Sequence, residues 1–135
     1  RLSMESLVHV IAEAKSADAL AEELLRAREE VTLELATASA PSHVRSLLVR
    51  ALSIHAHGLA FPRAVIPAIK LAAAADKLCR RTGHLVARCL VDPSDAGPLV
   101  LLQNTLSRQL ASADAAECGG ALLAICRLEE AAAGA

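Results

Sequence analysis

The sequence predicts an all-helical protein, an up-down four-helix bundle with long, alanine-rich helices. Its 135 residues are 54% hydrophobic and 21% charged, a balance typical of a chain that buries a core rather than of a disordered one. Aromatic residues are nearly absent, with Phe61 alone, whereas alanine, which has the highest helix propensity, is abundant. Alternating apolar and polar runs, which would indicate strands, are missing. We therefore expect one helical domain spanning residues 1–135.

The first predicted helix covers residues 7–38 and carries an apolar stripe at steps of three and four residues. Only Arg28 interrupts this stripe, and flanking apolar residues widen it beyond what a two-stranded coiled coil buries. Arg28 must therefore reach the bundle end, find a carboxylate, or mark a place where the core opens to a partner. The alternative is two shorter helices split at residues 16–18, with Ser16 as the N-cap. The stripe consists of Leu7, Val10, Ala14, Ala17, Ala21, Leu24, Val31, Leu35 and Ala38.

A second helix is expected after Pro41, and it ends around His57 and Gly58, where glycine suits a left-handed C-terminal cap. The third predicted helix begins at Pro62 or Pro67, and its apolar stripe continues to residue 89. The stripe keeps its register on both sides of Gly83, so we expect one continuous helix. A break near residues 82–83 is the alternative, because glycine costs about 1 kcal/mol relative to alanine inside a helix.

The fourth predicted helix follows the loop at residues 92–98, which is rich in proline, glycine, serine and aspartate. Its apolar stripe runs from Leu99 to Ala116, and we expect a kink or a close helix contact at the pair Gly119 and Gly120. Four helices with short connections predict an up-down-up-down bundle. Six shorter helices arranged as helical repeats are the competing fold.

The composition argues against several classes of function. A net charge of −1 and the lack of aromatic rings are unfavourable for nucleic-acid binding. No apolar run is long enough to span a membrane, because charged residues such as Lys70 and Asp76 interrupt every candidate. The chain begins at Arg1 without a leader sequence, so we interpret it as a domain excised from a larger protein. We expect a cytoplasmic protein whose four cysteines are reduced: Cys79, Cys89, Cys118 and Cys126.

No motif in the sequence indicates an enzyme, a metal or a cofactor. His55 and His57 lie two residues apart and would point to different sides of a helix, so they are a poor metal-binding pair. The stretch beginning at His57 and Gly58 faintly resembles histidine phosphotransfer bundles, but lacks the lysine and the second glycine expected there. No phosphate-binding loop, nucleophile elbow or zinc-protease motif is present in the sequence.

The third predicted helix carries a more specific pattern between Leu71 and Cys89. It resembles the vinculin-binding site of talin rod bundles, L-x-x-A-A-x-x-V-A-x-x-V-x-x-L-I-x-x-A, with Thr82 and Gly83 as departures. Alanine-rich bundles of this length also resemble modules of the wider talin, vinculin and α-catenin group. Four positions match identically, and four others are near-isosteric. The identical positions are Leu71, Ala74, Ala75 and Leu85, and the near-isosteric ones are Leu78, Cys79, Val86 and Cys89.

This resemblance implies an actin-associated scaffold of the cytoskeleton or of cell adhesion, which recruits a helical protein partner by helix-in-groove contacts. We therefore predict a non-enzymatic protein–protein interaction module. The alternatives are a histidine phosphotransfer-like bundle that uses His57, and an oligomerisation or repeat domain whose first helix pairs with itself. The predicted partner-binding residues are Leu71, Ala74, Ala75, Leu78, Thr82, Leu85 and Val86.

Overall fold

The computed structural model describes residues 3–13 and 17–133, and the regular elements within these ranges are all helices. The predicted all-α class is confirmed. Seven α-helices and one short 3-10 helix are found in the described ranges, so the four-helix bundle is not confirmed. The elements are α1 (Met4–Glu13), α2 (Ala17–Thr37), α3 (Pro41–Ala56), η1 (Pro62–Ala64), α4 (Val65–Ala72), α5 (Lys77–Leu90), α6 (Ala96–Leu110) and α7 (Ala115–Ala133).

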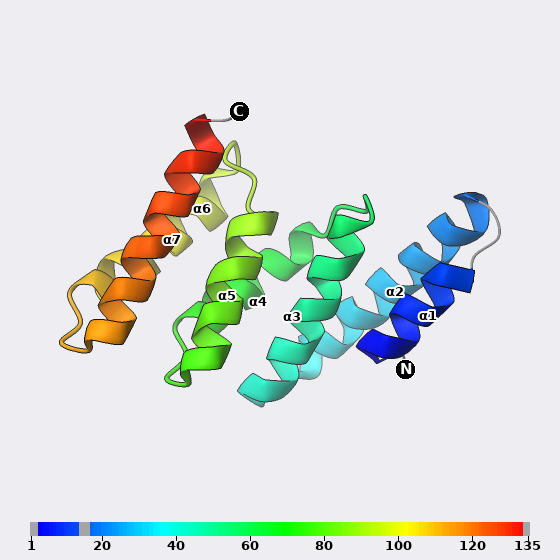
Figure 1. Cartoon of the computed structure of the whole chain (residues 1–135), viewed down its shortest axis with the longest axis horizontal. Coiled ribbons are helices and arrows are strands. Elements are labelled where there is room, and N and C mark those ends of the chain that lie inside the picture. The colour runs from blue at the N-terminus through cyan, green and yellow to red at the C-terminus, as the bar shows by residue number, and fades with distance from the viewer. Residues whose placement is uncertain (1–2, 14–16, 134–135) are drawn as a thin grey trace.

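The helices form a row of stacked pairs in two layers. Helices α3, α5 and α7 lie side by side in one layer, and α2, α4 and α6 lie behind them (Figure 1). Each helix of one layer packs on its chain neighbour in the other, as α2 does on α3, α4 on α5 and α6 on α7. Helix α1 packs on α2 and α3 at the opposite end of the row from α7. The pairs are stacked in a row, as in an α-solenoid, and their buried apolar residues form one continuous cluster along the row, from Leu7 in α1 to Ala124 in α7.

The single first helix predicted for residues 7–38 is wrong, because α1 ends at Glu13 and α2 begins at Ala17. The proposed cap Ser16 lies outside the described residues. Separate helices allow α1 to pack against α2 and α3, and this packing buries Leu7 within the core cluster. The heptad therefore runs over two separate helices, α1 and α2, that pack against each other.

The boundaries of the second helix are confirmed. Helix α3 begins at Pro41 and ends at Ala56. Gly58 follows with a φ of 99°, the left-handed conformation that favours glycine. After this turn, Pro62 opens η1 and Pro67 lies within the first turn of α4, where its missing amide proton costs little.

The continuous third helix is wrong, because α4 ends at Ala72 and α5 begins at Lys77. The carboxylate of Asp76 caps α5 by accepting a hydrogen bond from the backbone nitrogen of Cys79 at 2.9 Å. The alternative break at Gly83 is wrong as well, because Gly83 lies inside α5. A β-carbon added at Gly83 would overlap the backbone nitrogen of Ala72, so glycine is required where α5 packs closely against the end of α4.

The fourth predicted helix also consists of two helices, α6 and α7, separated at residues 111–114 rather than at the glycine pair. Asp114 caps α7 by accepting a hydrogen bond from the backbone nitrogen of Ala116 at 3.0 Å. Helix α7 runs through Gly119 and Gly120 without interruption. The α4–α5 and α6–α7 boundaries therefore both lie where an alanine-rich stretch meets an aspartate.

An internal repeat relates α5 to α7. The sequence Gly83-x-Leu85-x-Ala87-x-Cys89 recurs as Gly120-x-Leu122-x-Ala124-x-Cys126. In both helices the leucine and the cysteine are exposed and the alanine is buried, so the repeated residues occupy equivalent positions. The two copies begin at Gly83 and Gly120, and this spacing along the sequence lies within the range of helical-hairpin repeats, about 34 to 47 residues. This repeat agrees with the stacked-pair architecture and with the competing fold considered above.

Candidate functional site: a basic groove between α5 and α7

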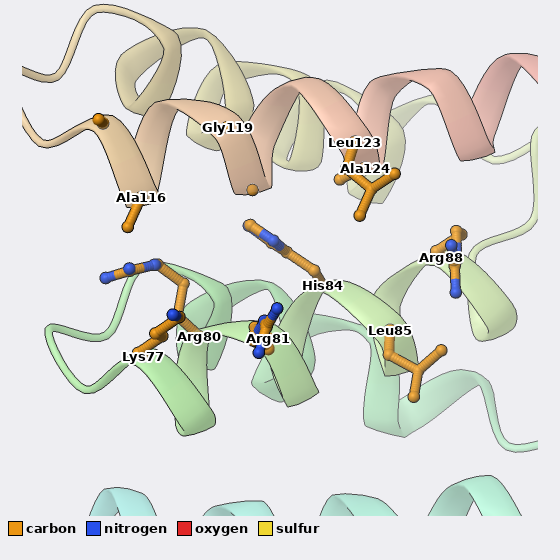
Figure 2. A pocket seen from close by; sticks show the side chains of 12 residues that line it. Lys77, Arg80, Arg81, His84, Leu85, Arg88, Ala116, Gly119, Leu123 and Ala124 are labelled. Atoms are coloured by element: carbon orange, nitrogen blue, oxygen red, sulfur yellow. The ribbon is translucent and has the colours of Figure 1, made fainter.

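An open groove with a volume of about 410 Å³ lies between α5 and α7. Basic side chains form the α5 wall, and mostly small residues face them from α7 (Figure 2). No aspartate or glutamate is among the residues that line it. The α5 wall consists of Lys77, Arg80, Arg81, His84, Leu85 and Arg88, and the α7 wall of Ala115, Ala116, Gly119, Gly120, Leu123 and Ala124.

The basic wall follows from helical spacing. Lys77, Arg81 and Arg88 lie four and seven residues apart, so one face of α5 carries all three. Within the described ranges, none of these three side chains forms an ion pair or a side-chain hydrogen bond. Like charges at four-residue spacing repel each other, so this face is electrostatically unfavourable in the absence of an anion.

Arg80 contributes a charge and also stabilises the connection between α4 and α5. Its side chain is only 6% exposed, and its Nη1 donates to the backbone oxygens of Ala75 at 3.2 Å and Ala74 at 3.5 Å. These carbonyls follow the last turn of α4, where a cation is favourable. The bonds attach α5 to the linker that precedes it.

His84 lies at the floor of the groove and is 9% exposed. Its Nε2 lies 2.8 Å from the Oε1 of Gln109, and the amide nitrogen of Gln109 donates to the backbone oxygen of Ala72. Because the Gln109 oxygen is the acceptor, the His84 proton resides on Nε2. This buried network connects α5, α6 and the end of α4 directly beneath the groove.

The pKa of His84 is lowered from its ordinary value of 6.5. Burial is the main cause, because it disfavours the charged imidazolium, and the nearby charges of Arg80 and Arg88 lower the pKa further. The hydrogen bond with Gln109 acts in the opposite direction without reversing the shift. His84 is therefore held neutral at physiological pH, and the charge of the groove comes from its lysine and arginines.

The α7 wall leaves the groove open because it carries little side-chain volume. A β-carbon added at Gly119 would meet no atom within 4 Å, and one added at Gly120 would be 4.0 Å from the His84 ring. Figure 2 shows His84 pointing from α5 towards Gly119. Leu123 is the large residue of this wall and is 58% exposed. The groove thus combines cations, a backbone that a ligand can approach closely, and exposed leucine.

The structure does not bring the predicted partner-binding residues onto one face. Leu71 is buried in α4, and Ala74 and Ala75 lie in the linker before α5. Thr82 is buried, and its hydroxyl donates to the Leu78 carbonyl at 2.9 Å while accepting a bond from Arg45.

The remaining predicted residues lie on α5 and differ in exposure. Val86 is buried, whereas Leu78 is 54% exposed and Leu85 is 41% exposed. Of the predicted residues, Leu85 is the one that also lines the groove.

Arg28, His57 and the cysteines lie outside the lining of the groove. The Nη1 of Arg28 donates to the backbone oxygen of Ala60 at 3.0 Å, so this side chain binds a carbonyl rather than the expected carboxylate. His57 is exposed, and its Nδ1 lies 2.8 Å from the backbone oxygen of Ser53. All four cysteines are free; Cys79 is buried, whereas Cys89 and Cys126 are exposed.

The net charge of the whole chain conceals the basic groove. The value of −1 averages an acidic α2 with a basic α5, in which Lys77, Arg80, Arg81 and Arg88 occur without an acidic residue between them. The spacing of these cations was visible in the sequence. Their position opposite the small residues of α7 was not.

The chain matches no protein-family model, no curated protein and no solved structure. In the part of the chain that the structure covers, no helix is both long and apolar enough to cross a membrane.

Proposed function

We propose that this chain is a non-enzymatic protein interaction module that binds a segment of a protein partner in the groove between α5 and α7. The observation that carries this proposal is the pairing of an unneutralised cationic face on α5 with small residues on α7. A peptide backbone can approach glycine and alanine closely, and the exposed leucines on both walls offer apolar contacts.

The side chains of the groove are suited to binding rather than to bond breaking. His84 is the groove residue whose ordinary pKa is nearest neutrality, but it is buried, neutral and bonded to an amide. A general base in a catalytic triad is instead oriented by a carboxylate that stabilises its protonated form. The cations supply electrostatic attraction, which determines partner choice and association rate.

A displayed library of random peptides tests this proposal. The wild-type chain should enrich peptides that the Gly119→Trp variant does not bind, because the tryptophan fills the groove. Gly119 is exposed with free space around it, so this substitution should leave the helices intact by circular dichroism. Gly119→Ala is the matched control and should retain binding. The proposal is wrong if the wild type enriches no peptide over Gly119→Trp.

A talin- or vinculin-like scaffold is the more specific form of this function that the sequence resemblance suggests. Leu78 and Leu85, seven residues apart on α5, are both exposed and offer a first apolar contact for a helical partner. Full helix-in-groove binding would also require Leu71 and Val86, which are buried, so the α4–α5 pair would have to open.

A synthetic peptide covering residues 70–90 tests the scaffold hypothesis against a vinculin head domain. We expect saturable binding that a Leu78→Ala/Leu85→Ala peptide loses, as measured by fluorescence anisotropy. No saturable binding of the parent peptide would reject the vinculin-like form without affecting the groove proposal.

A further inference from the structure

The charge and length of the groove identify the chemistry of its partner. Four lysine or arginine side chains line it, and no carboxylate does. Lys77, Arg81 and Arg88 have no ion-pair partner in the described chain, so their charges remain available to a ligand. A ligand that carries several negative charges relieves the mutual repulsion of these cations as well as attracting them.

The surroundings of two of the lining residues, His84 and Arg80, agree with this view. The pKa of His84 is lowered in part by Arg80 and Arg88, so the positive potential extends to the floor of the groove. Arg80 is almost fully buried, and its described partners are backbone carbonyls, which leave its charge without a compensating carboxylate. A buried cation of this kind is favourable beside an anionic ligand.

The dimensions favour a short peptide. From Lys77 to Arg88 the α5 wall extends over about 16 Å, at about 1.5 Å per residue. An extended chain advances about 3.3 Å per residue, so about five residues would occupy this length. Leu85 and Leu123, from opposite walls, provide an apolar contact for one side chain of such a segment.

The same features disfavour a nucleic acid. Single-stranded nucleic acids are bound by stacking their bases on aromatic rings, and no aromatic side chain lines the groove. Outside the groove, the acidic face of α2 and the net charge of −1 would repel a long polyanion. A short acidic peptide avoids this repulsion because it ends within the groove.

We propose that the α5–α7 groove binds an acidic segment of a protein partner, about five residues long, with carboxylates contacting Lys77, Arg81 and Arg88 and one apolar side chain contacting Leu85 and Leu123. This inference rests on the proposed function, because it identifies the chemistry of the segment that the groove accepts.

Fluorescence anisotropy with defined peptides tests the inference on the full chain. The probe is a labelled peptide of about ten residues, rich in glutamate, with one central leucine. We expect saturable binding that weakens about tenfold or more when glutamine replaces glutamate, and that weakens further as salt is raised. The glutamate peptide binding no better than the glutamine peptide would overturn the inference.

Charge reversal in the groove provides the second arm of this test. Arg81→Glu/Arg88→Glu should weaken binding of the acidic peptide about tenfold or more, because two attractions become repulsions. Arg63→Glu/Arg108→Glu is the matched control with the same change in net charge: both arginines are exposed and lie outside the groove, so this variant should change binding by less than about twofold. Equal binding by the groove variant and the control variant contradicts the inference.

The outcomes also separate this inference from the proposed function. Library peptides that are enriched through the groove but lack acidic residues would reject the acidic ligand and keep the interaction module. If a single-stranded oligonucleotide displaces the acidic peptide and binds more tightly than the peptide does, the ligand of the groove is a nucleic acid and the inference is overturned. Failure of the library screen itself would reject both.

Discussion

At the scale of single residues, His84 shows how one side chain combines packing with electrostatics. It is buried beneath the groove, and its Nε2 proton is bonded to Gln109, which in turn is bonded to the end of α4. Replacing the imidazole by an apolar ring would leave the Gln109 oxygen buried without its donor. No local sequence pattern reveals this role, because residues 84 and 109 lie far apart in the sequence and come together where α5 and α6 both pack against α4.

The variant His84→Phe should lower the free energy of unfolding by about 1 to 3 kcal/mol at pH 7.5, the cost of a buried polar group left unsatisfied. This cost should shrink at pH 5.5. The pKa of folded His84 lies below its ordinary value of 6.5, so the unfolded chain takes up more protons as the pH falls through 6.5, and the wild type loses stability that His84→Phe cannot lose. Urea unfolding at both pH values measures the difference.

The titration of Asp76 does not contribute to the difference between the cost of His84→Phe at pH 7.5 and its cost at pH 5.5. Its pKa is lowered from 3.8, chiefly by the hydrogen bond from the backbone of Cys79, so its contribution is complete above 3.8 and is lost only as the pH falls through its folded value. The wild type and the His84→Phe variant both contain Asp76, so its titration affects the two proteins equally. An equal cost of His84→Phe at pH 7.5 and pH 5.5 would show that the imidazole is not held neutral.

At the scale of helices, the boundaries depend on caps and close contacts that the apolar periodicity does not reveal. The linkers at residues 73–76 and 111–114 each span four residues, about one helical turn, so the apolar stripe resumes almost in register after each break. Asp76 and Asp114 were the available signals, because aspartate is a favourable N-cap. The glycines were misleading, since Gly83 and Gly119 both lie inside helices.

The two helical glycines should respond in opposite ways to alanine. Gly119→Ala should raise the free energy of unfolding by about 1 kcal/mol, because alanine has the higher helix propensity and the added carbon meets free space. Gly83→Ala should lower it by about 1 to 3 kcal/mol or more, because the added carbon overlaps the backbone of Ala72. Chemical denaturation of the two variants gives both values, and a stabilised Gly83→Ala would contradict the close α4–α5 packing.

At the scale of the whole molecule, stability should follow the stacking of the pairs. Helices α4 and α5 occupy the middle of the row and pack closely against each other and against neighbours on both sides. Helix α1 lies at one end of the row and packs against α2 and α3. In a stacked architecture each unit depends on its neighbours, so the end helices open most easily.

Hydrogen–deuterium exchange measured by mass spectrometry should therefore be slowest in peptides from α4 and α5 and fastest in those from α1. Helix α7, at the other end, should exchange faster than α5. Arg81→Glu/Arg88→Glu should leave this order unchanged, because both side chains lack partners in the described structure. Protection of α1 equal to that of α5 would indicate one cooperative core instead of stacked pairs.

The sequence by itself determined the helical class, the apolar face and the ends of α3, and the row of cations on α5, whereas the apolar stripe predicted for α5 places Leu78 and Leu85, which are exposed, in the core. These properties depend on residues within a few positions of one another, through helix propensity and the repeat of 3.6 residues. Only the tertiary structure decided that the helices stack in pairs and that the cations of α5 face Gly119 and its small neighbours on α7. That arrangement depends on the packing of whole helices, for example where Gly83 admits the end of α4, and local periodicity carries no information about it.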